Sequence, residues 1–212
     1  MRFRSGIGAA LAAVLAVALM AGVAAAATIT GDDSDNVLTG TPQSDQIQAK
    51  GGNDTVSALG GADLIAAGEG NDLVDAGPGP DAVRGGPGND QLAGGDGRDL
   101  LRGREGDDRE SGGAGDDTMY AGQGVDVLAG GAGDDVIFAR AQADVPVSGA
   151  DTVFGEAGND VIVVRDGEAD VVGCGSGHDL VIADSQDVVR PSCERVRIGK
   201  PRPSDDNSEV AS

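Results

Sequence analysis

The sequence has few basic, aromatic or imidazole side chains. Its 212 residues include 15 Lys and Arg against 36 Asp and Glu, no Trp, one Tyr, three Phe and one His. The net charge of −21 makes nucleic acid and anionic membrane surfaces poor partners. The shortage of aromatic rings also leaves little for a binding surface that depends on exposed aromatic side chains.

Residues with catalytic chemistry are scarce as well. The one histidine, His178, lies in a predicted turn beside Asp179, and nothing marks the nearby Ser176 as an activated nucleophile. We interpret His178 as a solvated turn residue, with a catalytic role as the alternative. No catalytic residue is therefore predicted.

The chain begins with a hydrophobic run behind two basic residues. Arg2 and Arg4 precede an apolar stretch from Ile7 to about Ala27 that ends in small residues. This pattern is typical of a secretory signal peptide, and retention as a membrane anchor is the alternative. We predict a secreted, extracellular protein with no stable membrane insertion after cleavage. Without Arg2 and Arg4, 13 basic side chains would face 36 acidic ones, a net charge of −23.

The sequence contains two cysteines, Cys174 and Cys193. In an exported protein, a disulfide between them is the default expectation. A redox or metal-binding pair is the alternative, but there is no CxxC spacing and no nearby cluster of ligands.

An aspartate recurs every nine residues, without a break, from Asp45 to Asp135. A glycine stands two positions before each of these aspartates except the first, where Gln43 takes its place. A large apolar residue stands two positions after each, except that Glu110 replaces it once. Three columns in one register identify a repeat array.

Each nine-residue unit divides into a turn of about six residues and a strand of about three. Residues 85–90 (GGPGND) and 112–117 (GGAGDD) show fully developed turns. The strand turns one apolar side chain inward and so buries roughly 2 kcal/mol of apolar surface. Ordering nine residues costs on the order of 10 kcal/mol, so this thin core needs another source of stability.

The aspartates suggest that source. If two units form one coil, residues eighteen apart stack at the strand spacing of roughly 4.8 Å. Carboxylates stacked so closely cannot stay ionised without a cation between them. Carboxylates and exposed carbonyls without Cys or His form a hard-oxygen site, which suits Ca²⁺ better than Mg²⁺ or Zn²⁺. A metal-free solenoid with Asx-turn caps is the alternative. The two predicted edges are Asp81, Asp99, Asp117 and Asp135, and Asp72, Asp90, Asp108 and Asp126.

The unit GGxGxDxUx resembles the glycine-rich nonapeptide of the RTX family of haemolysin-type calcium-binding repeats, over residues ~30–190. The resemblance implies an all-β fold, a parallel β-roll (a right-handed β-solenoid) with two repeats per coil. It also implies several Ca²⁺ ions held between turns by Asp carboxylates and main-chain carbonyls. In three of these turns, Lys50, Leu59 and Arg104 replace the second glycine. The metal ligands implied are Asp54, Asp63, Asp72, Asp81, Asp90, Asp99, Asp108, Asp117, Asp126, Asp135 and Asp160.

The repeat pattern divides the chain into five predicted segments. These are a signal peptide (1–27), the calcium-binding roll (28–138), a loop insertion (139–150), degenerate repeats with a disulfide-clipped cap (151–198) and a disordered tail (199–212). The insertion lacks turn glycines and has Pro146 in the apolar place. It is interpreted as an ordinary surface loop, with a recognition loop as the alternative.

We predict a non-enzymatic calcium-binding protein that folds on binding the ion, because low hydrophobicity and high charge favour disorder in its absence. No HExxH or GxSxG motif is present. An extracellular adhesion or matrix module, binding a glycan or a cell-surface protein, is the alternative. A polysaccharide-cleaving β-solenoid enzyme is less favoured, because these carboxylates lie in turns rather than on strands.

Overall fold

The computed structural model describes residues 25–139 and 149–200. The predicted signal peptide up to residue 24, residues 140–148 of the predicted insertion and the tail from residue 201 lie outside the described residues. The described residues contain no helix long and apolar enough to cross a membrane.

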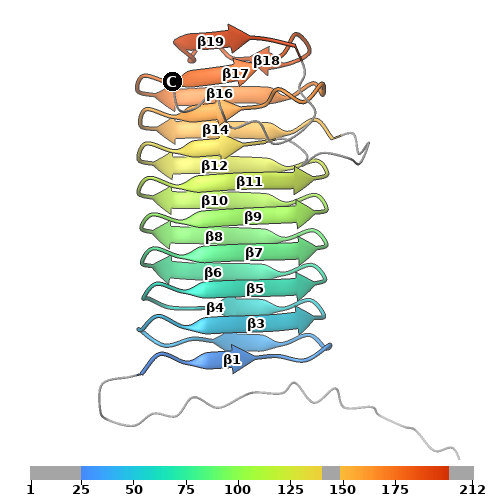
Figure 1. Cartoon of the computed structure of the whole chain (residues 1–212), viewed down its shortest axis with the longest axis vertical. Helices are drawn as coiled ribbons and strands as arrows, with labels where there is room; N and C mark the ends of the chain where they lie inside the picture. Colours follow the sequence, from blue (N-terminus) through green and yellow to red (C-terminus); the bar gives the residue numbers. More distant parts are fainter. Residues whose placement is uncertain (1–24, 140–148, 201–212) are drawn as a thin grey trace, which may run out of the picture.

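The described chain is a stack of parallel strands in two sheets (Figure 1). One sheet contains ten strands: β1 (Thr28–Thr30), β3 (Gln46–Gly51), β5 (Leu64–Glu69), β7 (Ala82–Pro87), β9 (Leu100–Glu105), β11 (Thr118–Gln123), β13 (Val136–Phe138), β15 (Val161–Val163), β17 (Leu180–Ala183) and β19 (Arg195–Ile198). The other contains nine: β2 (Val37–Thr39), β4 (Thr55–Ser57), β6 (Leu73–Pro78), β8 (Gln91–Asp96), β10 (Arg109–Ala114), β12 (Val127–Ala132), β14 (Thr152–Ala157), β16 (Val171–Ser176) and β18 (Val188–Val189).

Successive strands alternate between the two sheets, and each strand pairs in parallel with the strand two places further along the chain. Two repeats therefore form one coil, and the register places Ile47 against Ile65, and Ile65 against Val83. The prediction of an all-β parallel solenoid with two repeats per coil is confirmed.

The strands are longer than the sequence pattern predicts. We expected strands of about three residues, whereas most have six, as in β5. The parallel ladder continues through the first residues of each predicted turn, where Lys50 pairs with Gly68 and Gly51 with Glu69. Backbone pairing needs no side chain, so the hydrophobic pattern ends before the strand does.

Each full-length strand consequently turns two side chains inward. The first is a large apolar residue in every such strand but β10, which has Glu110, and the second, two positions further on, is Ala or Gly in every such strand but β16, which has Cys174. In β5 these residues are Ile65 and Ala67, and both are buried. The interior is therefore narrow, with one large and one small side chain from each such strand.

The turns that depart from the glycine pattern keep its backbone conformation. The second glycine has positive φ in regular turns, as at Gly77 (97°) and Gly86 (147°). Lys50, Leu59 and Arg104 adopt φ values of 84°, 79° and 98° at the same place. A left-handed conformation costs a non-glycine residue roughly 1–2 kcal/mol, so the stacked neighbours must impose it.

The last coils carry the disulfide. Cys174 in β16 is fully buried, and Cys193 packs against the core from the segment before β19. The bond joins the two residues across a Cα–Cα distance of 5.0 Å. It ties the segment that leads into β19 to β16, near the end of the described stack.

Leu59→Gly should increase the free energy of unfolding by roughly 0.5–1 kcal/mol, because it removes a left-handed leucine whose side chain is 43% exposed. The matched control is Leu64→Gly on the extended strand β5, where the leucine is 56% exposed and the change should cost about 1 kcal/mol. Urea unfolding of both variants measures the difference. Equal losses in the two variants would contradict the argument.

Candidate metal centre

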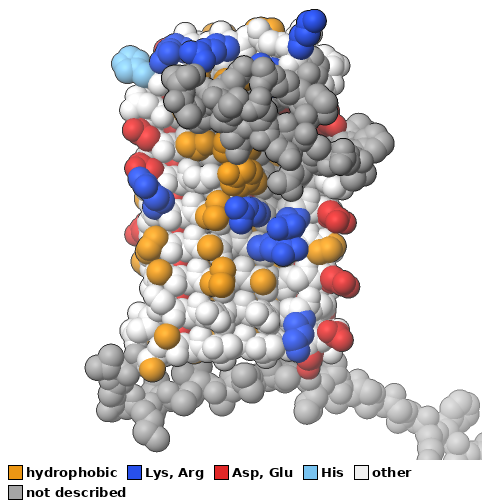
Figure 2. Space-filling view, viewed as in Figure 1, with side chains coloured by type: hydrophobic (Ala, Val, Ile, Leu, Met, Phe, Trp, Pro, Cys, Tyr) orange, Lys and Arg blue, Asp and Glu red, His pale blue; other side chains and the backbone are white. Residues whose placement is uncertain are grey.

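Each repeat aspartate lies at the end of a turn, immediately before a strand. Asp63 directly precedes β5, for example, and Asp90 directly precedes β8. From Asp45 to Asp179 these aspartates are at most 3% exposed, although each bears a carboxyl group. Figure 2 shows other Asp and Glu side chains along the two lateral edges of the stack, where the turns lie.

The aspartates form one ladder at each edge. Both ladders continue past the predicted insertion, because the step from Asp126 to Asp151 and that from Asp135 to Asp160 lengthen to 25 residues without breaking the stack. The first ladder contains Asp45, Asp63, Asp81, Asp99, Asp117, Asp135, Asp160 and Asp179. The second contains Asp54, Asp72, Asp90, Asp108, Asp126, Asp151, Asp170 and Asp187.

One oxygen of each carboxylate is held by the backbone of the neighbouring coil. The Asp81 N–H donates to Asp99 Oδ1 at 2.8 Å, and the Asp90 N–H donates to Asp108 Oδ1 at 2.8 Å. The same bond recurs along both ladders. Because it fixes the carboxylate plane, it also fixes the direction of the second oxygen.

That second oxygen, Oδ2, is buried and has no hydrogen-bond partner among the described residues along most of both ladders. A buried carboxylate oxygen without a partner costs free energy comparable to that of a lost hydrogen bond or more. The aspartates concerned are Asp54, Asp63, Asp72, Asp81, Asp90, Asp99, Asp108, Asp117, Asp126, Asp135, Asp160, Asp170 and Asp179.

Main-chain carbonyl oxygens approach the same places. A Cβ added to Gly94 would lie 2.5 Å from Asp99 Oδ2 and 2.6 Å from the carbonyl oxygen of Gly112 in the next coil. Gly85 and Gly130 show the same arrangement. A carboxylate oxygen from one coil and a carbonyl oxygen from the next thus lie close together beside the glycine, and oxygens of these two kinds are ligands that suit Ca²⁺.

The first position of the turn distinguishes the sites more than the second does. Turns leading to five of the predicted ligands have Ala at the first position. A Cβ at the corresponding glycine of other turns would lie beside Oδ2, so we expect the alanine methyl group to narrow that space. The second position of the turn keeps the positive φ of glycine even where Arg104 occupies it. The alanines are Ala49, Ala58, Ala67, Ala76 and Ala121.

Burial raises the pKa of ladder aspartates such as Asp90, Asp108 and Asp135. Loss of solvation is the largest cause, backbone N–H donation partly offsets it, and neighbouring carboxylates add to it. The pKa rises to about 7 for Asp90, about 8 for Asp108 and about 7 for Asp135. At neutral pH, the folded ladder thus holds carboxylates that resist ionisation in the absence of a cation.

Several ladder members were absent from the predicted ligand set. Asp151, Asp170 and Asp179 continue the two ladders, and the Asp179 N–H donates to Glu194 Oε2 at 3.0 Å. The sequence pattern nevertheless restarts at Asp151 and continues more loosely through Asp170 and Asp179, and each of the three aspartates has an apolar residue two positions later. His178 is exposed in its turn, and its backbone N–H donates to Asn159 Oδ1 at 3.0 Å.

The fold and the ladders define a parallel β-solenoid whose turns carry buried carboxylates. The sequence matches the family of the RTX calcium-binding nonapeptide repeat over residues 22–56, 39–74, 48–83, 75–110, 111–146 and 147–168. The chain therefore belongs to this family of calcium-binding repeats. A comparison with curated proteins finds no match.

The raised pKa values predict that the metal-free fold is more stable in mild acid than at neutral pH. The folded state binds more protons than the unfolded chain, so its stability is fully present below the unfolded Asp pKa of about 3.9. That stability is lost as the pH rises through the folded values, from about 6 for Asp81 to about 8 for Asp108.

Circular dichroism in chelator should therefore show strand content at pH 5 that falls between about pH 6 and 9. Asp108→Asn should move this loss to higher pH, whereas Asp75→Asn, on the exposed side of β6, should not. Strand content that instead grew from pH 5 to pH 9 would contradict the prediction.

Proposed function

We propose that this calcium-binding repeat protein acts outside the cell, without catalysis, and that its roll folds as Ca²⁺ ions fill the turns. The observation that carries the proposal is the row of buried, unpartnered Oδ2 atoms that face carbonyl oxygens of the next coil. A Ca²⁺ ion would satisfy both kinds of oxygen and neutralise the stacked charge.

The proposed ligands combine the ladder aspartates with carbonyls of the first turn residue. The turns with Gly at that position provide the most room, namely those of Asp90, Asp99, Asp108, Asp117, Asp135 and Asp160. The turns of Asp54, Asp63, Asp72, Asp81 and Asp126 form the second group.

Folding and binding would be coupled for two reasons. The narrow interior buries little apolar surface, and the raised pKa values mean that the metal-free roll disfavours ionised ladders at neutral pH. Each ligand set also draws on two successive coils, so a filled site favours ordering of its neighbour. Binding free energy then contributes directly to folding.

Export through the predicted signal peptide, residues 1–27, would bring the chain to a suitable calcium concentration. Extracellular sites with Kd of roughly 10⁻⁴–10⁻³ M fill there, whereas cytosolic calcium would leave them empty. A non-enzymatic role is supported by the carboxylates themselves, because one oxygen of each is held by a backbone N–H within the stack.

Binding to a cell-surface glycan or protein is the second candidate. It is favoured by one group on the outer face of the odd-numbered sheet. The partly buried Tyr120 stacks on the buried Phe138 at 4.9 Å, and the exposed Arg102 guanidinium lies 5.3 Å from the Tyr120 ring centre. A ring with a neighbouring cation suits sugar or peptide contacts. The group is small, so calcium binding remains the first proposal.

A calcium titration of the full chain tests the proposal. Circular dichroism at pH 7.5 should change cooperatively from coil to strand at sub-millimolar to millimolar Ca²⁺, and Mg²⁺ should not replace it. Asp99→Asn should raise the midpoint calcium concentration about threefold or more, because it removes one charged ligand. Asp75→Asn, on the exposed side of β6, is the matched control and should leave it unchanged.

A chain that is already fully β-structured in chelator at this pH, with no response to Ca²⁺, would contradict the proposal. The ladder would then act as metal-free turn chemistry.

A further inference from the structure

The turn between β15 and β16 departs from the repeat. Residues 164–170 read VRDGEAD, one residue longer than the six-residue GGxGxD turn, and the ladder step from Asp151 to Asp170 is 19 residues. Gly167 has a φ of 103° and provides the left-handed position. In place of small turn residues, the segment brings two additional carboxylates, Asp166 and Glu168.

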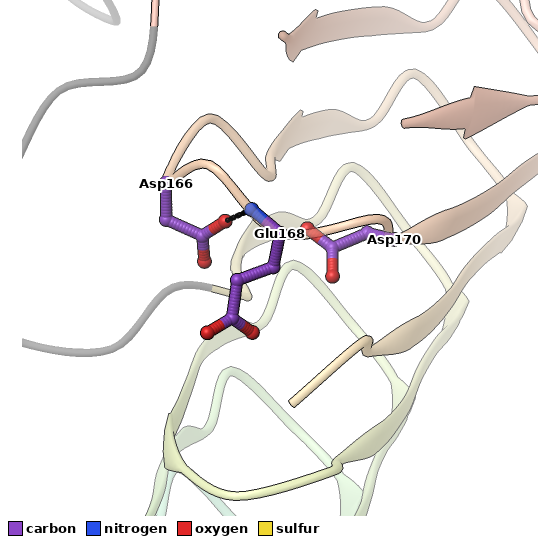
Figure 3. A group of neighbouring side chains, drawn as sticks. All are labelled: Asp166, Glu168 and Asp170. Carbon is purple, nitrogen blue, oxygen red and sulfur yellow. Dashed lines mark hydrogen bonds between the residues drawn. The ribbon is translucent and has the colours of Figure 1, made fainter. Parts of the chain in front are cut away.

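The three carboxylates of this turn lie together (Figure 3). Asp166, Glu168 and Asp170 each offer one ligand oxygen, and these oxygens lie within 4.8 Å of one another. Asp166 and Glu168 are partly buried, and Asp170 is fully buried. Such a spacing is compatible with a single Ca²⁺ bound at 2.3–2.6 Å from each oxygen.

Backbone hydrogen bonds hold the three side chains in place. The Glu168 N–H donates to Asp166 Oδ1 at 3.0 Å, the Gly149 N–H to Glu168 Oε2 at 2.7 Å, and the Asp151 N–H to Asp170 Oδ1 at 2.8 Å. The turn itself is anchored to the next one, because the Gly167 N–H donates to Asp184 Oδ2 at 2.8 Å.

An independent observation points to a ligand. Asp170 is 0% exposed, and its Oδ2 has no hydrogen-bond partner among the described residues although it belongs to this group. Burial and the charges of neighbouring carboxylates, including Glu168, raise the pKa of Asp170 to about 8. Like charges this close need a counter-ion that the backbone cannot provide.

We propose that Asp166, Glu168 and Asp170 form a separate Ca²⁺ site made of three side-chain carboxylates. It rests on the proposed function and extends it, because the repeat turns offer one carboxylate beside carbonyl oxygens. A larger ligand charge raises calcium affinity, so this site fills at a lower calcium concentration than the repeat turns.

The test is Asp166→Asn combined with Glu168→Gln in the full chain, with Ca²⁺ as the only probe. Native mass spectrometry counts the bound ions, and calorimetry gives the affinity of the first binding phase. The double variant should bind one ion fewer and lose a phase about tenfold tighter than the rest. Glu69→Gln with Asp75→Asn removes the same charge from exposed positions of β5 and β6 and should change neither quantity.

An unchanged ion count and first-phase affinity in the double variant would overturn this site while leaving calcium binding by the repeats intact. A wild-type chain that binds a single ion, lost in the double variant, and shows no coil-to-strand transition would support the site and overturn the proposed function.

A second observation concerns Glu110 in β10. It occupies the inward apolar position, pairs in register with Leu92 and Leu128 of the adjacent coils, and is 3% exposed. Neither of its carboxylate oxygens has a hydrogen-bond partner among the described residues. A buried carboxylate between leucines is costly unless a cation or a donor reaches it.

Glu110 Oε1 reaches the turn of Asp108. A Cβ added to Gly103 would lie 2.2 Å from Asp108 Oδ2, 2.6 Å from Glu110 Oε1 and 2.8 Å from the carbonyl oxygen of Ala121. Two carboxylate oxygens and a carbonyl oxygen therefore lie close together beside Gly103, where other turns of this kind have one carboxylate oxygen. We infer that Glu110 is an additional ligand, from the interior, for a Ca²⁺ ion bound at Asp108.

Glu110→Leu tests this, because the variant residue matches Leu92 and Leu128. At about pH 6, where the metal-free roll is predicted to keep strand content, urea unfolding of the full chain should show a higher midpoint in chelator and a smaller calcium-induced increase in that midpoint. Met119→Leu, at the same inward position of β11, is the control and should alter neither. Equal stabilisation by Glu110→Leu with and without Ca²⁺ would show that Glu110 is no ligand.

Discussion

The hydrogen bond from each aspartate N–H to the Oδ1 atom of the aspartate one coil later is the interaction on which the rest of the structure depends. It sets the register between coils, because it can form only when the turns stack in phase, and it recurs at 2.7 Å between Asp63 and Asp81 as at 2.8 Å between Asp151 and Asp170. It also requires the carboxylate to be buried, which leaves Oδ2 inside the stack. The bond that orders the fold therefore creates the demand for a cation.

The narrow interior follows from the same constraint. Full-length strands turn one large and one small residue into the space between the two sheets, as Ile65 and Ala67 do in β5. Glycine is required at the fourth position of the turn, where successive coils touch, since a Cβ on Gly115 would lie 1.6 Å from the carbonyl oxygen of Gly97. The stack thus depends on backbone pairing and turn chemistry more than on apolar burial.

The repeat sequence predicts the solenoid, its two sheets and the two ladders, because three columns of residues in one register determine which side chains stack. It does not predict the full strand length, since glycines carry no pattern that distinguishes strand from turn. Nor does it predict that Arg104 adopts the positive φ of the glycine it replaces, a conformation that the stacked neighbours impose. Asp151, Asp170 and Asp179 lie outside the predicted ligand set, although the sequence pattern restarts at Asp151 and continues in a looser form through Asp170 and Asp179. The stack shows that each of them joins one of the two ladders.

The departures from the repeat bear on which state the sequence favours. Random loss of the pattern would remove charge from the ladders, yet Glu110 and the pair Asp166 and Glu168 add carboxylates beside carboxylates that are already buried. Each addition destabilises a metal-free roll at neutral pH, as the raised pKa values of Glu110 and Asp166 indicate. The same additions stabilise a roll that holds calcium, because they enlarge the ligand set where oxygens already converge. A sequence that worsens one state and improves the other at the same positions is suited to switching between them with the calcium concentration.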